Sequence, residues 1–364
     1  MRIAFVRQRY TSSGGAERFI ERAAAALARL GAEVSVIARA WPEQPGVRIV
    51  RVDPPHLGGL WRDLGFARAA RAAWRAGGYD LVQCHERIPG CDLYRAGDGV
   101  HRQWLEHRLA AASILERLRL RFDPRHLYLC AAERALFRHP ALRAVICNSR
   151  MVQAEIARRF GLPEERLPIV HNGVDLDRFR PARIERTGPF VFLFVGSGFA
   201  RKGLAHALAA LARVPEARLV VAGGDRRLRR YEALARRLGL AARVRFLGAV
   251  TDPLPLYGEA DCFILPSLYD PFPNAALEAL ACGLPVIVSE RCGTAEILRE
   301  GESGWICRAG DATDLARALR QALARARAPE LRRGARAAAE PYSLEAMAGR
   351  LVKLYERLCG TPVR

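Results

Sequence analysis

Residues 190–203 read FVFLFVGSGFARKG, an apolar run that passes through a glycine-rich turn to two cations. The apolar run predicts a buried strand, Gly196 and Gly198 predict a turn, and the residues that follow Arg201 and Lys202 are helix-forming. A buried strand that leads through a tight turn into a helix is typical of a βα unit in a parallel sheet. This stretch therefore predicts an α/β fold.

The same loop is suited to binding a diphosphate. Backbone N–H groups at a helix start, the positive end of the helix dipole and two fixed cations all attract anions. Lys202 is one of only two lysines among 58 basic residues, which indicates that a compact ammonium is required there. The loop lacks the Walker A pattern, and Arg201 replaces the third glycine of the dinucleotide pattern, so a kinase or a nicotinamide enzyme is disfavoured. A plain strand-to-helix turn with exposed basic residues is the alternative.

Apolar runs alternate with alanine-rich amphipathic runs along the chain, which predicts two doubly wound, Rossmann-like domains. We expect strands at 3–6, 34–38, 79–85, 144–149, 190–196, 218–224, 244–248, 262–267 and 285–289, and helices at 16–30, 60–76, 125–138, 150–160 and 343–359. We expect an N-terminal domain over 1–170, a linker over 171–189, a C-terminal domain over 190–340, and a C-terminal helical segment over 341–364 that packs back on the first domain.

A second chemical signal lies at 265–290, in LPSLYDPFPNAALEALACGLPVIVSE. Asp270 is expected at the mouth of a strand, and PNAALEAL is expected to begin a helix whose early N–H groups face the same crevice. Carboxylates accept hydrogen bonds from hydroxyl groups, so Asp270 and Glu278 are candidates for holding a sugar and a ribose. The alternative is that Glu278 is a surface residue of an alanine-rich helix.

The chain is strongly basic, with a formal charge of +20 and a pI near 10.5. Basic surfaces bind phosphate backbones, which raises nucleic acid as a partner. The arginines, however, are spread through both halves in alanine-rich runs, without a basic tail, so a compositional bias explains them. Nucleic acid is therefore disfavoured, and an anionic membrane or acceptor explains the charge at least as well.

The cysteine pattern and the hydropathy favour a cytoplasmic protein. The nine cysteines are scattered without a C-x-x-C pair, which predicts reduced thiols and no zinc site. The first apolar run is too short for a signal peptide. No apolar run approaches the roughly 18 residues of a membrane-spanning helix.

Five segments, taken in this order, resemble the large retaining glycosyltransferase family 4, whose GT-B fold has two Rossmann-like domains facing a cleft. They are GGAERFIERAAAALARLG at 14–31, HNGVDLDRF at 171–179, FVGSGFARKG at 194–203, the segment from Asp270 to Glu278, and GTAEILREGESGWIC at 293–307. Within the family, PGCDLYRAGDGVHRQW at 89–104 is most similar to glucosyltransferases that extend the inner core of bacterial lipopolysaccharide.

The resemblance implies roles for residues of the second domain. Arg201 and Lys202 match a basic pair that binds the donor diphosphate and stabilises the departing charge. Glu278 matches an acid expected on the ribose hydroxyls. Asp270 stands where the family has a glutamate that contacts the transferred sugar, which shortens the side chain by one methylene. The other implied donor-binding residues of this domain are Gly196, Gly198, Phe272, Pro273, Asn274 and Ala275. In the first domain, Gly14 and Gly15 match a glycine loop that faces the donor phosphates or the acceptor.

In the first domain, the resemblance implies that Asp98 is the polar group near the reacting carbon, as in the lipopolysaccharide-type members. His101 is the alternative for that role, unless it is a solvated loop histidine. His85 and Glu86 end a predicted strand, where sheet ends line a crevice, and they are acceptor-side candidates that could equally be structural. Trp104 is a further acceptor-side candidate.

Residues 100–126 are rich in arginine and histidine, with Trp104, Leu105, Leu115 and Leu118 interleaved. An amphipathic basic segment of this kind can lie on an anionic leaflet. The expected location is therefore cytoplasmic, peripheral on the cytoplasmic face of the inner membrane. An ordinary helix with a solvated basic face is the alternative.

The resemblance implies transfer of a hexose, with retention of configuration, to a lipopolysaccharide-core or other lipid-linked glycan. UDP-glucose is the preferred donor, ahead of UDP-N-acetylglucosamine and GDP-mannose. We expect no cofactor and no metal, because Asp175 and Asp177 form a D-x-D pair in a turn, where capping is the expected duty. The alternatives are a sugar-nucleotide epimerase of similar fold, which needs no acceptor, and a basic nucleic-acid-binding protein.

Overall fold

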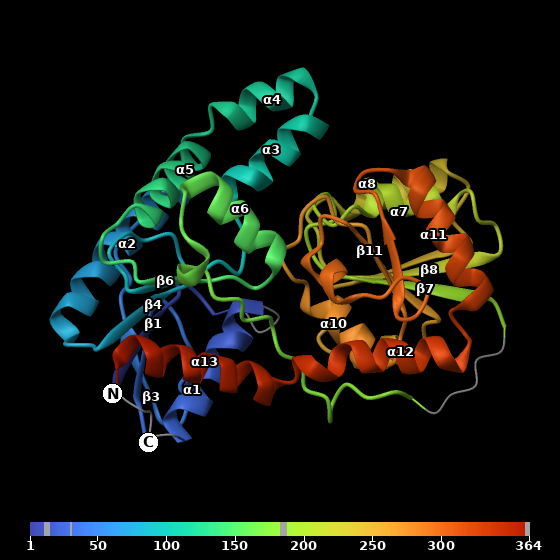
Figure 1. Cartoon of the computed structure of the whole chain (residues 1–364). Helices are drawn as coiled ribbons and strands as arrows, with labels where there is room; N and C mark the ends of the chain where they lie inside the picture. Colours follow the sequence, from blue (N-terminus) through green and yellow to red (C-terminus); the bar gives the residue numbers. More distant parts are fainter. Residues whose placement is uncertain (11–14, 30, 183–187, 361–364) are drawn as a thin grey trace. The chain divides into compact units, whose positions relative to one another are not determined.

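The computed structural model describes residues 1–10, 15–29, 31–182 and 188–360. The chain forms two compact units, Met1–Asn172 with Glu345–Arg364, and Gly173–Leu344. Each unit contains a six-stranded sheet (Figure 1). All strand pairs within both sheets are parallel. The predicted α/β class with two doubly wound sheets is therefore confirmed.

The first sheet has the strand order β3-β2-β1-β4-β5-β6. Its strands are β1 (Arg2–Val6), β2 (Glu33–Ala38), β3 (Val47–Arg51), β4 (Leu81–Cys84), β5 (Leu93–Arg95) and β6 (Ala144–Ile146). Its helices are α1 (Gly15–Arg29), α2 (Gly58–Gly77), α3 (His101–Ala111), α4 (Ile114–Arg121), α5 (Pro124–Phe137), α6 (Arg150–Phe160) and α13 (Leu344–Cys359), with the 3-10 turn η1 (Glu164–Arg166).

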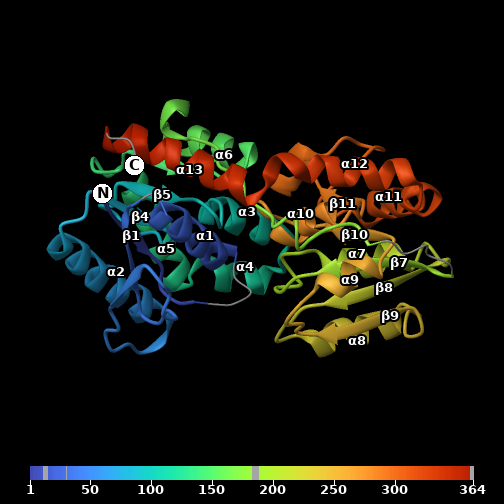
Figure 2. The same cartoon turned by 90° about the horizontal axis from the view of Figure 1, so that it is seen from below.

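Helices cover both faces of the first sheet, as a doubly wound fold requires. Along β1, Ile3 and Phe5 face a core that contains the apolar sides of α1 and α13, whereas Ala4 and Val6 face a core that contains α2, α5 and α6. The alternation follows from the two-residue period of a strand. The C-terminal helix α13 thus completes one face of the first unit, through Met347 and other apolar residues (Figures 1 and 2).

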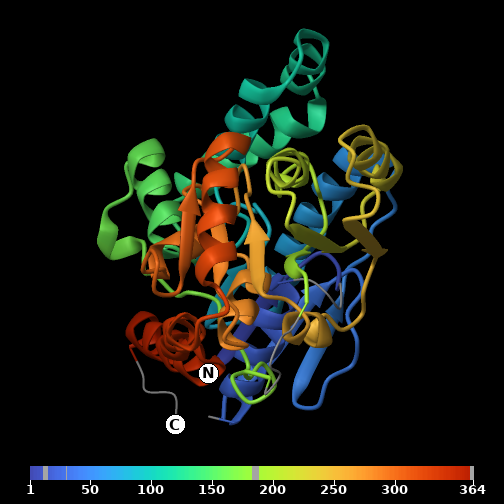
Figure 3. The same ribbon diagram turned by 90° about the vertical axis from the view of Figure 1, so that its right-hand side faces the viewer.

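Helices α3 and α4 project away from the first sheet (Figures 1 and 3). The segment 100–126, which the sequence presents as one basic run, is divided at Ser113, the N-cap of α4. Asp123 then caps α5 through the backbone N–H groups of Arg125 and His126. A small cluster around Leu105 and Leu120 holds the two helices together.

The second sheet has the strand order β12-β11-β10-β7-β8-β9. Its strands are β7 (Phe190–Val195), β8 (Ala217–Ala222), β9 (Val244–Gly248), β10 (Cys262–Leu265), β11 (Val286–Ser289) and β12 (Gly304–Cys307). Its helices are α7 (Leu204–Leu211), α8 (Leu228–Arg237), α9 (Leu254–Gly258), α10 (Asn274–Ala281), α11 (Ala312–Arg325) and α12 (Pro329–Ala339), with the 3-10 turns η2 (Gly293–Ile297) and η3 (Glu340–Tyr342).

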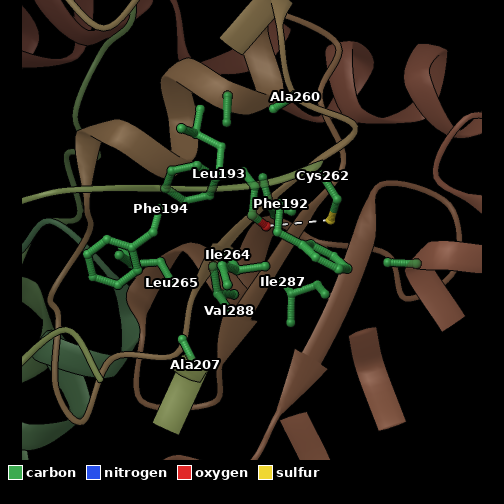
Figure 4. Close-up of a cluster of buried hydrophobic side chains, with 14 of the residues drawn as sticks. Phe192, Leu193, Phe194, Ala207, Ala260, Cys262, Ile264, Leu265, Ile287 and Val288 are labelled. Atoms are coloured by element: carbon green, nitrogen blue, oxygen red, sulfur yellow. Dashed lines mark hydrogen bonds between the residues drawn. The ribbon is translucent and has the colours of Figure 1, made fainter. Parts of the chain in front are cut away.

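The second unit has one continuous core, built on the central strands β10 and β7 and on their neighbours β11 and β8. Phe192, Ile264 and Ile287 are fully buried there (Figure 4). Helix α7 packs against α8 and α11, and α10 packs against α12. These two groups of helices lie on opposite sides of β7 and β8 (Figure 1). Central strands covered on both faces are expected to be uniformly apolar, as FVFLFV is.

Three short strands, β3, β5 and β12, have no counterpart in the predicted set. The predicted boundaries at 170, 189 and 340 differ from the observed division, which falls after Asn172 and after Leu344. No helix in the described part of the chain combines the length and the apolar character needed to cross a bilayer.

Candidate functional site

The loop between β7 and α7 depends on glycine at two places. A Cβ on Gly196 would lie 2.6 Å from Cδ and Cε of Lys202, so the glycine leaves room for that side chain. Gly203 has φ +75°, and a Cβ there would lie 2.0 Å from the carbonyl oxygen of Pro266. Glycine adopts this left-handed conformation without a steric cost. The loop can therefore pass close to the end of β10.

Hydrogen bonds fix the turn that carries the two cations. The backbone N–H groups of Arg201 and Lys202 both donate to the carbonyl of Gly198, at 3.0 and 3.1 Å. The carboxylate of Asp225, which follows β8, accepts from the N–H of Phe199 at 2.8 Å. Phe199 itself is fully buried. Asp225 was not predicted from the sequence, although its position directly after a strand was a usable signal.

Arg201, Lys202 and Asp270 meet in one ion cluster. The Nζ of Lys202 donates to Oδ2 of Asp270 at 2.9 Å, and the Nη1 of Arg201 lies 3.0 Å from the same oxygen. Arg201 also donates to the carbonyl of Tyr269 at 3.1 Å. The side chains of Lys202 and Asp270 are 10% and 9% exposed, whereas that of Arg201 is 36% exposed. The ion pair is thus largely shielded from water, and Arg201 is its accessible member.

The charge state of Asp270 follows from two opposing effects. Burial by itself would raise the pKa of this carboxyl, but the charges of Arg201 and Lys202 outweigh it, so the pKa lies below its usual range. Asp270 is therefore ionised at neutral pH. Its backbone is held as well, since its N–H donates to the carbonyl of Arg291 and its carbonyl accepts from the N–H of Gly293.

Of the residues after Asp270, Phe272 packs in the core, and Pro273, Asn274 and Ala275 form the start of α10. Phe272 is buried and contacts Tyr342, with ring centroids 6.2 Å apart. Pro273 is the N-cap of α10 and provides no side-chain cap, and Asn274 and Ala275 form the partly buried first turn. The first-turn N–H groups of α10 are therefore not capped by the side chain of the preceding residue, which suits an anionic or hydroxyl ligand.

Glu278 lies one turn further along α10 and is 5% exposed, which rules out the alternative of a surface residue. Its Oε2 accepts a hydrogen bond from the hydroxyl of Tyr257 on α9, at 2.9 Å. Glu278 thus has a fixed orientation on a buried helix. Tyr257 was not recognised from the sequence, because nothing in LPLYG distinguishes it from a core residue.

Two hydroxyl groups at the carboxyl ends of β10 and β11 were also missed. The side-chain oxygen of Ser267 is buried without a hydrogen-bond partner among the described residues, and the buried hydroxyl of Thr294 has only the weak thiol of Cys292 beside it. Each follows a strand of the second sheet, Ser267 after β10 and Thr294 within η2 after β11. Buried hydroxyls of this kind ordinarily find a partner. They are therefore additional candidates for contacting a polar ligand.

In the first unit, Asp98 lies in the loop between β5 and α3 and is exposed. Its carboxylate makes no hydrogen bond or ion pair with the residues that the structure describes. Its charge nevertheless raises the pKa values of the nearby residues Arg7 and Arg87. Asp98 is thus an accessible carboxylate in cationic surroundings, free to contact a substrate.

His101 begins α3 and is held by its surroundings rather than solvated. Its ring nitrogen Nε2 lies 3.2 Å from Nδ1 of His126, and its ring stacks on Trp104 with centroids 5.4 Å apart. Burial, with a contribution from Arg87, lowers the pKa of His101 to about 3. Glu133 accepts from the backbone N–H of His101 at 2.8 Å. This cluster of His101, Trp104 and His126 therefore contains neutral rings that join α3 to α5.

His85 and Glu86 follow β4, as predicted from the strand pattern. His85 is 4% exposed and lies between the rings of Phe5 and Phe19. The Oε1 of Glu86 accepts from the backbone N–H of Gln8 at 3.0 Å. Burial raises the pKa of Glu86, and the nearby Arg7 opposes that effect.

Two further expectations concern the glycine loop at Gly14 and Gly15 and the pair of aspartates Asp175 and Asp177. Gly14 lies outside the described residues, and Gly15 is the first residue of α1. Asp175 accepts hydrogen bonds from the backbone N–H groups of Asp177 and Arg178, at 3.2 and 2.9 Å, which is a capping role. Within the described ranges, no group of three or more potential ligands could hold a metal ion.

A surface hollow of about 610 Å³ lies along β7, β8 and β9. It is lined by Leu193, Val220, Leu256 and other residues, none of which belongs to the ion cluster or to the start of α10. We therefore place the candidate site at the carboxyl ends of the strands, where ligands of open α/β sheets bind.

The chain matches two family models. Residues 13–178 match the model described as Glycosyltransferase Family 4, and residues 176–340 match the model described as Glycosyl transferases group 1. The second match includes the ion cluster and α10.

Curated relatives agree with these matches. A D-inositol 3-phosphate glycosyltransferase of Catenulispora acidiphila is 31% identical over 353 residues, which cover 84% of this chain and 81% of the relative. The lipopolysaccharide glucosyltransferase WaaG of Escherichia coli K12 is 25% identical over 324 residues, covering 84% of this chain and 85% of WaaG. A glycogen synthase of Mycobacterium tuberculosis is 35% identical over 186 residues, but the match spans only 45% of that relative.

Solved structures show the same architecture. The crystal structure of WaaG has a TM-score of 0.82 at 24% identity and covers 98% of this chain and 100% of WaaG. Anabaena HepE in complex with UDP-glucose has a TM-score of 0.76 at 20% identity and covers 98% of this chain and 100% of HepE.

Proposed function

Since the chain belongs to the group 1 glycosyltransferases of the family 4 type, with the GT-B fold, we propose that it transfers a hexose from a UDP-sugar to a glycan acceptor. The second unit binds the donor in this proposal. The first unit binds the acceptor.

The observation that carries the proposal is the ion cluster of Arg201, Lys202 and Asp270. Breaking the bond between an anomeric carbon and a phosphate leaves negative charge on the diphosphate, so fixed cations aimed at the leaving group lower the barrier most. Lys202 and Arg201 are held within 3.0 Å of Asp270, which orients both cations before a ligand arrives. Because two cations and the start of α7 supply the charge, we propose that no divalent metal is required.

UDP-glucose is the donor that we favour. The solved structure of Anabaena HepE is a complex with UDP-glucose, and WaaG is a lipopolysaccharide glucosyltransferase by name. Asp270 and the first turn of α10 would hold the hexose, and Glu278 the ribose. We also propose that the anomeric configuration is retained and that Asp98 is the polar group nearest the reacting carbon.

We propose that the acceptor is a lipopolysaccharide core or another lipid-linked glycan. An exposed apolar set around α4 supports this proposal. It consists of Ile114, Leu115, Leu118, Phe122 and Leu127, each at least 52% exposed. Four exposed arginines alternate with these residues, at 117, 119, 121 and 125. Apolar side chains flanked by arginines favour the surface of an anionic bilayer. The protein would then be cytoplasmic and peripheral on the inner membrane.

Vesicle binding tests the membrane proposal. The protein should co-sediment with phosphatidylglycerol vesicles and not with phosphatidylcholine vesicles. Leu118→Asp and Arg119→Glu should each weaken binding by at least about fivefold, since one basic residue contributes about 1 kcal/mol and each variant also adds a negative charge. Arg229→Glu, an exposed charge reversal on α8, serves as the control and should leave binding unchanged. Equal binding by all variants, or no binding to anionic vesicles, contradicts the proposal.

A transfer assay tests the reaction. Incubation with UDP-glucose, a glycan acceptor and EDTA should release UDP and add one hexose to the acceptor, as seen by mass spectrometry. The proton coupling constant of the new linkage reports its configuration. Isomerised UDP-sugar formed without acceptor would identify an epimerase instead.

A further inference from the structure

Three buried side chains form a hydrogen-bond chain from α13 to the carboxyl end of β4. The hydroxyl of Tyr355 donates to Oε1 of Gln83 at 2.7 Å, and Nε2 of Gln83 lies 2.9 Å from Nε2 of His85. Tyr355 and Gln83 are fully buried and His85 nearly so. These hydrogen bonds link the C-terminal helix to His85, at the carboxyl end of β4.

The hydrogen bonds from Tyr355 through Gln83 fix the tautomer of His85. Because Oε1 of Gln83 accepts the phenolic proton, the amide nitrogen faces the imidazole and can only donate. Nε2 of His85 must then be the acceptor, and the single ring proton lies on Nδ1. The opposite amide orientation would leave the proton of Tyr355 without an acceptor among the described residues, and buried donors are rarely left so.

The Nδ1–H group of His85 donates no hydrogen bond to any described residue. Nδ1 is buried and has no hydrogen-bond partner among the residues described. Burial, reinforced by the charges of Arg95 and Arg7, lowers the pKa of His85, so the ring stays neutral at physiological pH. His85 therefore presents one neutral donor at the carboxyl edge of the sheet.

Arg95, on the neighbouring strand β5, has a second donor without a described partner, its Nε–H group. The pairing of Cys84 with Tyr94 between β4 and β5 brings the next residues, His85 and Arg95, side by side. The guanidinium of Arg95 lies 3.9 Å from the ring centroid of Phe19, which also contacts His85. The two side chains therefore share the face that α1 and α13 cover.

The charge of Arg95 has no counterion in direct contact. Burial lowers the pKa of its guanidinium, and the charge of the nearby Asp98 opposes that effect. Nη2 donates to Oδ1 of Asn172, but Nε is buried without a partner, and Arg95 forms no ion pair with any described carboxylate. A buried guanidinium ordinarily pairs with a carboxylate or a phosphate. The natural complement of a cationic and a neutral donor is an anionic oxygen.

We propose that His85 and Arg95 form a site for an anionic oxygen, a phosphate or carboxylate carried by the glycan acceptor, and that Tyr355 positions His85 by fixing its Nδ1–H tautomer. The inference rests on the proposed function, because it assumes that the first unit binds the acceptor. It deepens that function by naming the acceptor class as an anionic glycan.

The tautomer and the anion site can be tested without any sugar donor. In ¹⁵N-histidine-labelled protein, the ring resonances missing from His85→Asn identify His85. They should show a protonated Nδ1 in the wild type and a mixture of tautomers in Tyr355→Phe. Titration with inorganic phosphate should shift the Nδ1 resonance in a saturable way, with the other histidines as internal controls. A protonated Nε2, or a His85 resonance unmoved by phosphate, overturns the inference.

Substrate preference tests the acceptor class. The wild type should use a hexoside that bears a phosphate with at least about 10-fold higher kcat/KM than the same hexoside without it, the expected effect of charge-assisted hydrogen bonds. His85→Asn keeps a donor near the position of Nδ1 and should retain the preference. His85→Gln, whose amide lies near the position of Nε2, and Arg95→Met should lose it. Equal use of the two hexosides, or equal behaviour of the Asn and Gln variants, contradicts the inference.

Thermal stabilisation by UDP distinguishes a failure of this inference from a failure of the proposed function. Variants at 85 and 95 that still bind UDP and still use the hexoside without a phosphate have both units folded, so a lost preference then belongs to the acceptor site. Absence of UDP binding by the wild type refutes the proposed function, whereas the phosphate titration still decides the inference.

Discussion

The Oδ2 atom of Asp270 lies 2.9 Å from Nζ of Lys202, in a pair that is about one-tenth exposed. The same oxygen lies 3.0 Å from Nη1 of Arg201. One carboxylate thus holds both cations of the candidate diphosphate site. Its removal should affect stability as well as binding.

Asp270→Asn should lower the free energy of unfolding at pH 7 by about 3 kcal/mol, because it leaves two cations without their shared partner. The pKa of Asp270 is lowered in the folded protein, so its contribution is present above the unfolded pKa and is lost as pH falls through the folded value. The difference between wild type and variant should therefore shrink below about pH 4. Urea unfolding at pH 7 and pH 3.5 measures it, and a difference that is independent of pH would contradict the assignment.

Asp270→Glu should change sugar selectivity more than nucleotide binding. The longer side chain moves the carboxylate by one methylene, toward or past the hexose hydroxyls, whereas UDP contacts the cations. We expect the ratio of kcat/KM for UDP-glucose over UDP-N-acetylglucosamine to change by about tenfold, typical of one methylene in a pocket. The affinity for UDP, measured by calorimetry, should stay within about threefold. An unchanged ratio with weaker UDP binding would limit the role of Asp270 to holding Lys202 and Arg201 in place.

Two glycines with the same φ separate backbone strain from steric clash. Gly198 and Gly203 both have φ +75°, but a Cβ on Gly198 would meet nothing within 4 Å, whereas one on Gly203 would meet Pro266. Gly198→Ala should therefore cost about 1 kcal/mol of unfolding free energy, the cost of the left-handed conformation alone. Gly203→Ala should cost at least about 3 kcal/mol, since the backbone must also move. Equal losses in denaturant unfolding would show that the loop does not approach β10 this closely.

The histidine cluster on α3 predicts acid sensitivity. The folded pKa of His101 is about 3, below its usual value, so the unfolded chain binds more protons between those values and stability falls as pH decreases. Between pH 7 and pH 5, the titration of His101 should lower the free energy of unfolding by about 1 kcal/mol, a figure reduced for the partial exposure of its ring. His101→Gln should lose less stability over that interval than the wild type. An equal loss in both proteins would assign the acid sensitivity to other groups.

The fold was predictable where strands are central and apolar. FVFLFV and IAFV are covered on both faces and therefore have an unbroken apolar pattern. The edge strand β3, VRIVR, has no fully buried residue and was missed, because two of its five residues are exposed arginines. β5 has three residues, too few to show a period.

The site was predictable where chemistry is local in sequence. The rarity of lysine singled out Lys202, and the spacing of the acids singled out Asp270 and Glu278. The links of Asp270 to Lys202, of Glu278 to Tyr257 and of Gln83 to Tyr355 join residues 68, 21 and 272 positions apart. Such contacts depend on how the strands and helices pack, which no local pattern specifies.

Stabilisation by nucleotides tests the central claim most directly. The chain offers a matched pair of variants, Lys202→Ala in the ion cluster and Lys353→Ala, the other lysine, which is exposed on α13. A ligand at about 100 times its dissociation constant adds roughly 2.7 kcal/mol, a shift of several degrees in Tm. We predict that UDP raises the Tm of the wild type and of Lys353→Ala more than GDP or ADP does, and leaves that of Lys202→Ala nearly unchanged. An equal UDP shift in Lys202→Ala, or no shift in the wild type, would contradict a nucleotide-diphosphate site at this cluster.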